Sequence, residues 1–221
     1  MALPAALAQL DSDLDALANL FRDFAARNPA STAPRPLTLT EECLLEGLLS
    51  HAWQAWNTFC RSCVMSSCMG SPDATGAVIA PHPQALSEEL VAGAALDAKR
   101  KGILPNYWGA SITSLRQEPT WGDTDVLQKI VPRLQPNNAS KLVAAFSSIH
   151  DRARALQLIR NGAAHNHAEN MADILQLQSS YIAFRISHPV QALYWVEPSS
   201  GDFLITHALD ALKNAALLAI S

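Results

Sequence analysis

The sequence predicts an all-α protein, and three of its features lead to this fold class. Apolar residues recur in steps of four and three along the long segments, which is the repeat of an amphipathic helix. Hydrophobic residues make up 49% of the 221 residues and charged residues 16%, so a sizeable core is available. Segments rich in proline, glycine and serine separate the periodic stretches. We expect the helices to pack antiparallel in a bundle.

The first 36 residues predict one amphipathic helix and a linker. The apolar stripe begins at Leu3 and reaches Phe24, with acidic side chains beside it. Asn28 and Pro29 end the helix, and a loop follows as far as Pro36. We therefore separate this N-terminal segment, residues 1–36, from a larger helical domain over residues 38–221.

The middle of the chain predicts three helices of decreasing length. Threonine before a pair of glutamates favours a helix start, and Gly, Pro, Ser and Ala dominate the connector that follows. The expected elements are a helix from Thr38 or Thr40 to Cys63, a connector over residues 70–83, a helix over residues 87–101, an irregular stretch over residues 105–122 and a helix over residues 124–134.

The last third of the chain predicts three further helices, the last of them a C-terminal addition to the bundle. His188 and Pro189 interrupt the pattern, because a residue before proline disfavours helix. The expected elements are a helix from Asn138 or Ser140 through Leu156, a helix over residues 168–186, an extended segment over residues 190–196 and a helix over residues 204–219.

Composition limits the functional classes and the cellular location. The net charge is −4, whereas a protein that coats nucleic acid is usually basic, so any RNA contact must come from a local patch. No apolar run reaches the roughly 18 residues of a membrane span, and the start of the chain lacks the pattern of a signal peptide. We expect a cytoplasmic protein with no membrane partner and with reduced thiols.

Arg160 and His165 form the most informative motif of the sequence. On a continuous helix they would point about 140° apart. Asn161-Gly162 is a pair that often ends a helix, and Asn166 with Glu169 is a capping pair for a new one. We therefore expect Arg160 to close one helix and His165 to lie just before the next, so that both side chains face one pocket.

An arginine and a histidine beside a phosphate are sufficient for RNA cleavage without a metal. Histidine can move a proton to or from the ribose 2′-hydroxyl or the leaving oxygen. Arginine can pair with the charge that builds on the phosphorus oxygens, and Asn161 can orient either group. Unpaired N–H groups at the start of the next helix would favour a phosphate there. From the spacing alone, a surface arginine and a capping histidine without chemistry are the better interpretation.

The motif resembles that of the HEPN family, in which an arginine, a polar residue and a nearby histidine lie between two helices of an all-α bundle. Asn161 is the polar residue, and residues 47–61 also resemble helices of HEPN proteins from bacterial defence loci. The resemblance covers residues 38–221. It implies a HEPN-type bundle and a metal-independent endoribonuclease without cofactors that acts as a homodimer on RNA. It also implies a toxin–antitoxin or antiviral role with an antitoxin or defence-system partner.

Two alternatives to a nuclease stay open. Some HEPN proteins are non-catalytic modules that bind RNA or a partner protein, and the motif alone does not separate the two kinds. A helical regulatory subunit unrelated to nucleic acid is the third hypothesis. The acidic net charge favours these two, whereas Arg160, Asn161 and His165 together favour the nuclease.

Four further residues are candidates for the site. HEPN toxins paired with a nucleotidyltransferase antitoxin often carry tyrosine two residues after the histidine, and this chain has His167 there, which excludes modification of a tyrosine. His167 is an accessory candidate, and so is Glu46 on the second predicted helix. Arg152 and Arg154 lie on the helix that leads into the motif and are candidates for binding RNA phosphates.

The cysteines Cys60, Cys63 and Cys68, with His51, allow a zinc hypothesis. A structural zinc site usually takes four ligands from two turns, whereas these residues lie on a predicted helix. Cys63 also falls on the apolar stripe of that helix. We therefore expect buried thiols and no metal site.

Overall fold

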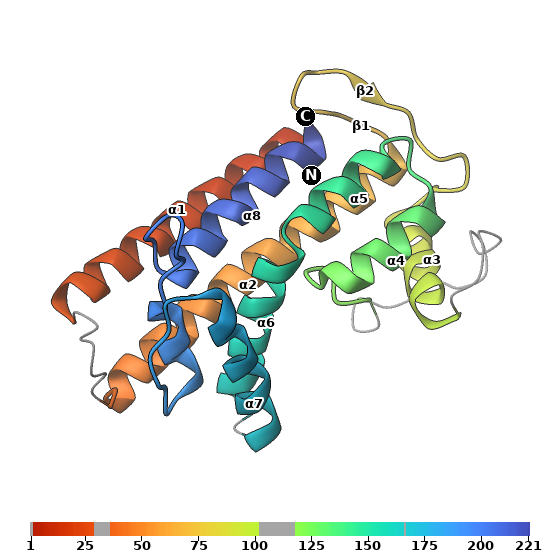
Figure 1. Cartoon of the computed structure of the whole chain (residues 1–221). Helices are drawn as coiled ribbons and strands as arrows, with labels where there is room; N and C mark the ends of the chain where they lie inside the picture. The colour runs from red at the N-terminus through yellow and green to blue at the C-terminus, as the bar shows by residue number, and fades with distance from the viewer. Residues whose placement is uncertain (1, 29–35, 102–117, 166) are drawn as a thin grey trace. The chain divides into compact units, whose positions relative to one another are not determined.

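The computed structural model describes residues 2–28, 36–101, 118–165 and 167–221 (Figure 1). Helices dominate these residues, which confirms the all-α class. The elements are α1 (Leu3–Arg27), α2 (Leu39–Met69), β1 (Ser71–Pro72), β2 (Val78–Ile79), α3 (Glu88–Lys101), α4 (Thr124–Leu134), α5 (Ala139–Ser148), α6 (His150–Ala164), α7 (Ala168–Gln176), the 3-10 helices η2 (Leu177–Ser180) and η3 (Pro189–Tyr194), and α8 (Leu204–Ile220). Within the described ranges, no helix is long and apolar enough to span a membrane.

The chain forms two compact units, and some of its helices contribute residues to both. The first unit consists of residues 1–11, 56–150 and 213–221, and the second consists of residues 12–55 and 151–212. This division does not follow the sequence boundary at residues 36–38. In the second unit, Phe21 of α1 packs on Tyr194 and Phe203, with ring centroids 5.2 Å and 5.6 Å apart, so α1 shares a core with the C-terminal part of the chain.

The N-terminal ends of the helices follow the capping residues of the sequence. The Thr38 hydroxyl accepts a hydrogen bond from the Glu41 N–H at 3.4 Å, and the Thr38 N–H donates to the Glu41 carboxylate at 2.8 Å. Ser87 accepts from the Leu90 N–H in the same way at the start of α3. These contacts identify Thr38, one of the two predicted starts, as the cap of α2, and they identify Ser87 as the cap of α3. At α5 and α7, by contrast, the cap residues Asn138 and His167 make no side-chain capping bond. Helix α2 continues six residues beyond Cys63 to Met69.

The first unit contains the connector between α2 and α3 and the packed group α3, α4 and α5. The connector forms a short antiparallel hairpin in which Ser71 pairs with Ile79. The Asp73 carboxylate accepts from the backbone N–H groups of Thr75 and Ala77 and closes the turn of that hairpin. Helix α4 packs against both α3 and α5.

The helix expected from residue 138 through Leu156 is interrupted, which corrects the sequence prediction. Helix α5 ends at Ser148, and Ile149 has φ −114° and ψ 8° before α6 begins. The Ser148 hydroxyl donates to the Ala145 carbonyl at 2.7 Å, and this carbonyl is the acceptor that the Ile149 N–H would use in a continuous helix. The predicted apolar face stays inside all the same, because Phe146, Ile149 and Leu156 are buried.

Two other predicted elements differ in the structure. The helix expected over residues 168–186 ends at Gln176, and Ile182 instead forms an isolated antiparallel bridge with Val196. The segment expected to be extended over residues 190–196 is largely the 3-10 helix η3. Pro189 occupies its first turn, and the buried Gln191 side chain accepts from the Ser187 and His188 N–H groups at 2.7 Å and 2.9 Å. These bonds favour a helical start over a strand.

Candidate functional site

Helix α6 continues through most of the motif, so the expected break between Arg160 and His165 is wrong. The helix ends at Ala164, and the His165 N–H still donates to the Asn161 carbonyl at 2.9 Å. His165 lies between α6 and α7, as predicted. Gly162 does not end the helix but serves packing, because a Cβ atom there would lie 2.7 Å from Ile174 Cδ1 of α7. Figure 1 shows α7 turning back alongside α6.

Asn161 connects Arg160 to the helix face that carries His165. At about 100° per residue, Asn161 and His165 share a face of α6, and Arg154 lies on the same face two turns earlier. Arg160 leaves the helix about 100° from Asn161. Its guanidinium Nη1 nevertheless donates to Asn161 Oδ1 at 3.1 Å. The structure therefore joins the side chain of Arg160 to that of Asn161, and no helix break lies between Arg160 and His165.

The turn after α6 holds its backbone firmly and leaves the His165 side chain exposed. The His165 carbonyl accepts from the His167 N–H at 2.7 Å and from Asn170 Nδ2 at 2.6 Å. The imidazole of His165 forms no hydrogen bond with a described residue. Arg160 is half-buried and has no ion pair within the described ranges. Both groups are therefore available to an external anion.

His167 occupies the N-cap position of α7. Its backbone has φ −108° and ψ 146°, and its exposed side chain makes no capping hydrogen bond. The capping pair expected from Asn166 and Glu169 includes Asn166, which lies outside the described residues. The structure thus places His167 two residues after His165 at the solvent boundary, where a ligand at the motif can be reached from the start of α7.

Glu46 contacts a histidine that the sequence analysis did not select. Its Oε1 lies 3.6 Å from His188 Nε2, and His188 Nδ1 is buried without a hydrogen-bond partner among the described residues. The following residue, Pro189, would be 3.4 Å from a Cβ atom at Gly162. Glu46 therefore reaches the surroundings of the motif through His188. The pair His188-Pro189 was interpreted as a helix stop, and no sequence pattern linked it to Glu46.

Arg152 and Arg154 differ in their surroundings although they are two residues apart. Arg154 is exposed on the face of Asn161 and His165. Arg152 is half-buried, and its Nε donates to His207 Nε2 at 3.2 Å. His207 lies on α8, and nothing in its sequence neighbourhood indicated this contact. Of the two arginines, Arg154 is therefore the one whose side chain is open to solvent, whereas Arg152 is held against His207.

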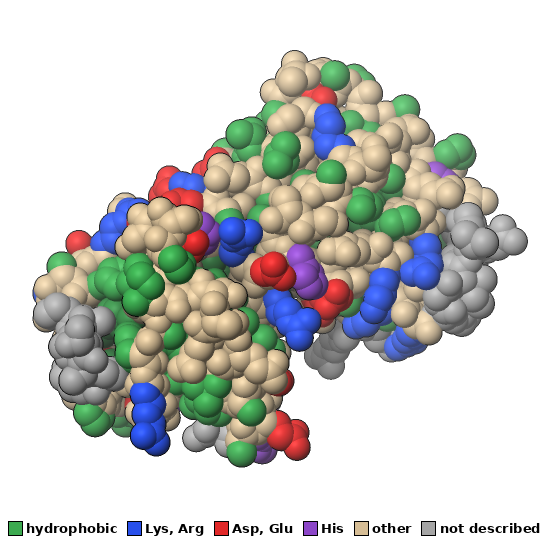
Figure 2. All heavy atoms as spheres, in the orientation of Figure 1, with side chains coloured by type: hydrophobic (Ala, Val, Ile, Leu, Met, Phe, Trp, Pro, Cys, Tyr) green, Lys and Arg blue, Asp and Glu red, His purple; other side chains and the backbone are tan. Residues whose placement is uncertain are grey.

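Figure 2 shows no continuous basic surface on the face that is drawn. Lys and Arg side chains lie in small groups, and acidic side chains stand between several of them. This distribution agrees with the net charge of −4. On this face, the side chains therefore do not form a broad positive field.

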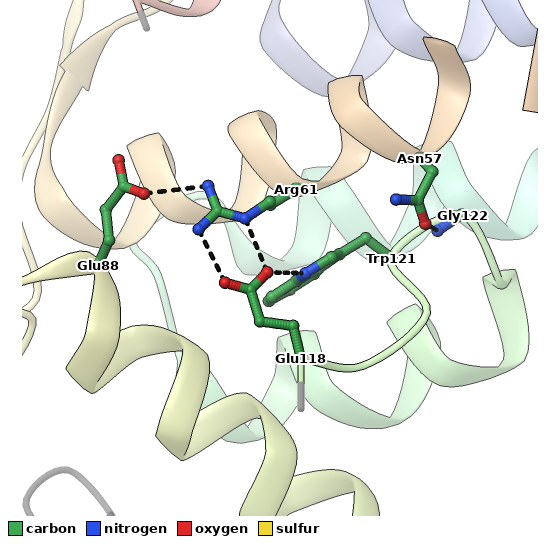
Figure 3. A network of polar contacts seen from close by, with 6 residues as sticks. All are labelled: Asn57, Arg61, Glu88, Glu118, Trp121 and Gly122. Atoms are coloured by element: carbon green, nitrogen blue, oxygen red, sulfur yellow. Dashed lines mark hydrogen bonds and ion pairs between the residues drawn. The ribbon is translucent and has the colours of Figure 1, made fainter. Parts of the chain in front are cut away.

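A separate polar network lies in the first unit around Arg61 (Figure 3). Arg61 donates to both carboxylate oxygens of Glu118 at 2.7 Å and 2.8 Å, and to Glu88 at 3.0 Å. Trp121 Nε1 also donates to Glu118, at 2.7 Å. Burial alone would raise the pKa of Glu118, but the hydrogen bonds from Arg61 and Trp121 and the charge of Arg61 lower that pKa overall.

This network borders a cavity of about 350 Å³ that is also lined by Ser62, Met65 and Ser66. Because the guanidinium of Arg61 is already bonded to two carboxylates, its charge is compensated within the chain. The network therefore fastens the segment after residue 117 to α2. None of the residues that the sequence singled out as a site belongs to it.

The cysteines show the features of buried thiols. Cys60, Cys63 and Cys68 are buried, and Cys43 is exposed. Burial raises the pKa of Cys63 and of Cys68 to about 12, and it raises the pKa of Cys60 well above its ordinary value. In the part of the chain that the structure describes, no group of three or more His, Cys, Asp or Glu residues is placed to hold a metal ion.

The residues singled out by the sequence lie in the second unit, on α2, on α6 and at the turn into α7. The structure joins Arg160 to Asn161, and it adds His188 and His207 as partners of Glu46 and Arg152. These contacts are the structural observations from which a function can be argued. No protein-family model, curated protein or solved structure shows significant similarity to this chain.

Proposed function

We propose that this protein is a metal-independent endoribonuclease of HEPN type, with its site at Arg160, Asn161 and His165. The observation that carries the proposal is the hydrogen bond between Arg160 Nη1 and Asn161 Oδ1, at 3.1 Å, one helical turn before the exposed His165. It holds a guanidinium that has no acidic partner among the described residues against Asn161, which lies on the helix face of the imidazole. An arginine and a histidine are the two groups that the cleavage of a phosphodiester by its neighbouring 2′-hydroxyl requires.

The reaction follows from the roles of these side chains. The ribose 2′-oxygen attacks the adjacent phosphorus, the bond from phosphorus to the 5′-oxygen breaks, and a 2′,3′-cyclic phosphate forms. His165 accepts the proton of the 2′-hydroxyl or gives one to the leaving 5′-oxygen. Arg160 pairs with the charge that develops on the phosphorus oxygens, and Asn161 keeps the guanidinium in place.

A second copy of the chain would complete this chemistry. One motif supplies one histidine, whereas the reaction is faster with both a base and an acid. An isologous dimer would bring two motifs to one cleft, and each chain would provide His165 to the shared site. His167 and Glu46 with its partner His188 are the accessory groups of each copy.

A non-catalytic module that binds RNA or a partner protein is the second candidate. The scattered basic side chains and the net charge of −4 favour it, because a nuclease for long RNA gains from a positive field. In either case the family resemblance implies a toxin–antitoxin or defence-system partner that controls the protein.

The deciding experiment is incubation with a labelled single-stranded RNA in the presence of a chelator, beside DNA of the same sequence. The proposal predicts RNA fragments that end in a 2′,3′-cyclic phosphate and predicts intact DNA, because DNA lacks the nucleophile. A strict requirement for magnesium or zinc would overturn the mechanism. RNA that is bound but never cut would support the non-catalytic candidate instead.

A further inference from the structure

Arg152 is a half-buried arginine of α6 that lacks a carboxylate partner. Its Nε donates to His207 Nε2 at 3.2 Å, and it has no ion pair with any residue that the structure describes. The half-buried Arg61, by contrast, is bonded to two glutamates. Burial of a guanidinium costs free energy unless its charge is compensated, so Arg152 is suited to receive an anion from outside.

The contact with Arg152 fixes the proton of His207. Arginine has N–H donors and no acceptor, so His207 Nε2 must present its lone pair to Arg152 Nε. The imidazole in this contact is therefore neutral and carries its proton on Nδ1. The pair as a whole offers further donors, namely the Nη groups of Arg152 and the Nδ1–H of His207.

Tyr181 has a hydroxyl donor and interacts electrostatically with Arg152. Burial is the main cause that raises the pKa of Tyr181, and the charge of Arg152 acts against it, so the hydroxyl keeps its proton at neutral pH. Two carboxylates also act on Tyr181, those of Glu197 and Asp151. Glu197 is engaged in its own turn, where it accepts from Ser199. Asp151 is exposed and remains the acidic group that opposes an anion here.

We propose that Arg152, His207 and Tyr181 form a second phosphate-binding subsite for RNA on the same helix as the motif. Arg152 and Arg160 are eight residues apart on α6, which is about 12 Å along the axis. A short stretch of RNA backbone can bridge this distance. The subsite holds a phosphate beyond the scissile one through charge-assisted hydrogen bonds, so it positions the strand without reading its sequence.

This inference rests on the proposed function, because it makes RNA the ligand of the second unit. It adds that the substrate extends over several nucleotides and is bound at two phosphates, one at the motif and one at the subsite. Binding of a phosphate does not distinguish ribose from deoxyribose. DNA is therefore expected to bind at the subsite although it is not cut.

The test measures binding of a labelled single-stranded RNA by fluorescence anisotropy, on a His165→Ala background that binds but does not cut. Arg152→Gln and His207→Leu are the test variants. Arg27→Gln is the matched control, because Arg27 is an exposed arginine of the same unit whose one polar contact with a described residue is its hydrogen bond to the Asp23 carbonyl. We expect Arg152→Gln to weaken binding about tenfold and to reduce the salt dependence by about one phosphate contact. Arg27→Gln should change the affinity less than twofold.

Asp151→Asn provides a second measurement that does not disturb a half-buried side chain. It removes the opposing carboxylate, so it should tighten binding of RNA and of DNA alike. Melting temperatures show whether each variant is folded. Inorganic phosphate should compete with RNA in the wild type and lose most of this effect in Arg152→Gln.

The outcomes separate this inference from the proposed function. Equal RNA affinities and salt slopes for Arg152→Gln and Arg27→Gln would overturn the subsite. If Arg152→Gln does not fold, an RNA affinity of Asp151→Asn equal to that of the parent protein would overturn it instead. RNA binding that depends on Arg152, without any cleavage by the wild type, would support the subsite and overturn the nuclease. A wild type that binds no RNA would overturn both.

Discussion

Asn161 partly compensates for the different directions in which Arg160 and His165 leave the continuous helix α6. Arg160 and His165 leave α6 about 140° apart, and the helix does not break between them. The Asn161 amide bridges part of this angle, because its oxygen accepts from Arg160 while its side chain leaves α6 on the His165 face. In the proposed mechanism, the amide therefore sets the position of the guanidinium relative to a phosphate at His165.

Asn161→Ala should slow RNA cleavage about 10- to 100-fold, because the removed hydrogen bond joins a neutral acceptor to a charged donor. The reduction should appear mainly in kcat, since the variant misplaces the guanidinium that acts in the transition state. Asn19→Ala is the control, because Asn19 accepts a comparable bond from Arg22 Nη1, at 3.1 Å, on α1. Equal kcat values for the two variants would show that Asn161 does not position Arg160.

At the scale of elements, the hairpin of α6 and α7 depends on a close approach at Gly162. The glycine is buried, and a Cβ atom there would meet Ile174 Cδ1 at 2.7 Å and Pro189 at 3.4 Å. Helices α6 and α7 and the 3-10 helix η3 therefore approach one another at Gly162, which has no side chain. The turn that presents His165 follows directly from this packing.

Gly162→Ala should be less stable than Gly47→Ala, by about 1 kcal/mol, because alanine improves helix propensity at both positions and only the methyl group at residue 162 forces Ile174 Cδ1 to move. Gly47→Ala is the control, since Gly47 is also a glycine inside a helix but has no atom within 4 Å of the added Cβ. That substitution should be neutral or stabilise by up to about 1 kcal/mol. Thermal unfolding measures both, and adding Ile174→Val to Gly162→Ala should restore part of the loss. A Gly162→Ala protein as stable as the Gly47→Ala protein would contradict the close approach.

The elements also show which features of the chain are readable from its sequence. Apolar periodicity and capping residues predicted α1, α2, α3, α4 and α8, because both signals are local. Gly162 was interpreted as a helix end, but glycine occurs both at helix ends and where helices pack closely. The contact with Ile174, twelve residues later, shows that Gly162 serves close packing. The partners His188 and His207 were missed for the same reason, since their contacts join distant parts of the chain.

The ion pair between Glu118 and Arg61 of α2 should make the free energy of unfolding depend on pH. The folded pKa of Glu118 lies below its ordinary value of 4.5, so the ionised form contributes stability at neutral pH. This contribution is lost as the pH falls below 4.5 through the folded pKa. Glu118→Gln should be less stable than the wild type at pH 7, and the difference should shrink in acid. A difference that stays constant from pH 7 to pH 3 would rule out the ion pair as its source.

At the scale of the whole molecule, the net charge of −4 contrasts with the proposed site for an anion. This charge gives no general attraction to RNA, so the proposed function assigns that attraction to individual arginines of α6. The all-α class and the buried face of Phe146, Ile149 and Leu156 could be predicted, because they depend on composition and period. The two-unit division could not, because each unit joins segments that lie far apart along the chain.

Light scattering at micromolar concentration should give a mass twice that of the 23.8 kDa chain, because one motif supplies only one of the two histidines. Leu175 on α7 is 38% exposed in the second unit and is suited to the interface. Leu175→Glu should therefore favour the monomer and lower cleavage, whereas Leu20→Glu on α1 should leave the mass unchanged. A fully active monomer would contradict the shared site.

The most direct measurement is the rate at which purified His165→Ala cuts RNA, with chelator present and beside the wild type. The imidazole is the proposed proton carrier, so its removal should slow cleavage at least about 100-fold while the helical signal stays unchanged. His167→Ala, two residues away and equally exposed, should retain most of the activity. Cleavage by His165→Ala at the rate of the wild type would contradict the assignment of the site.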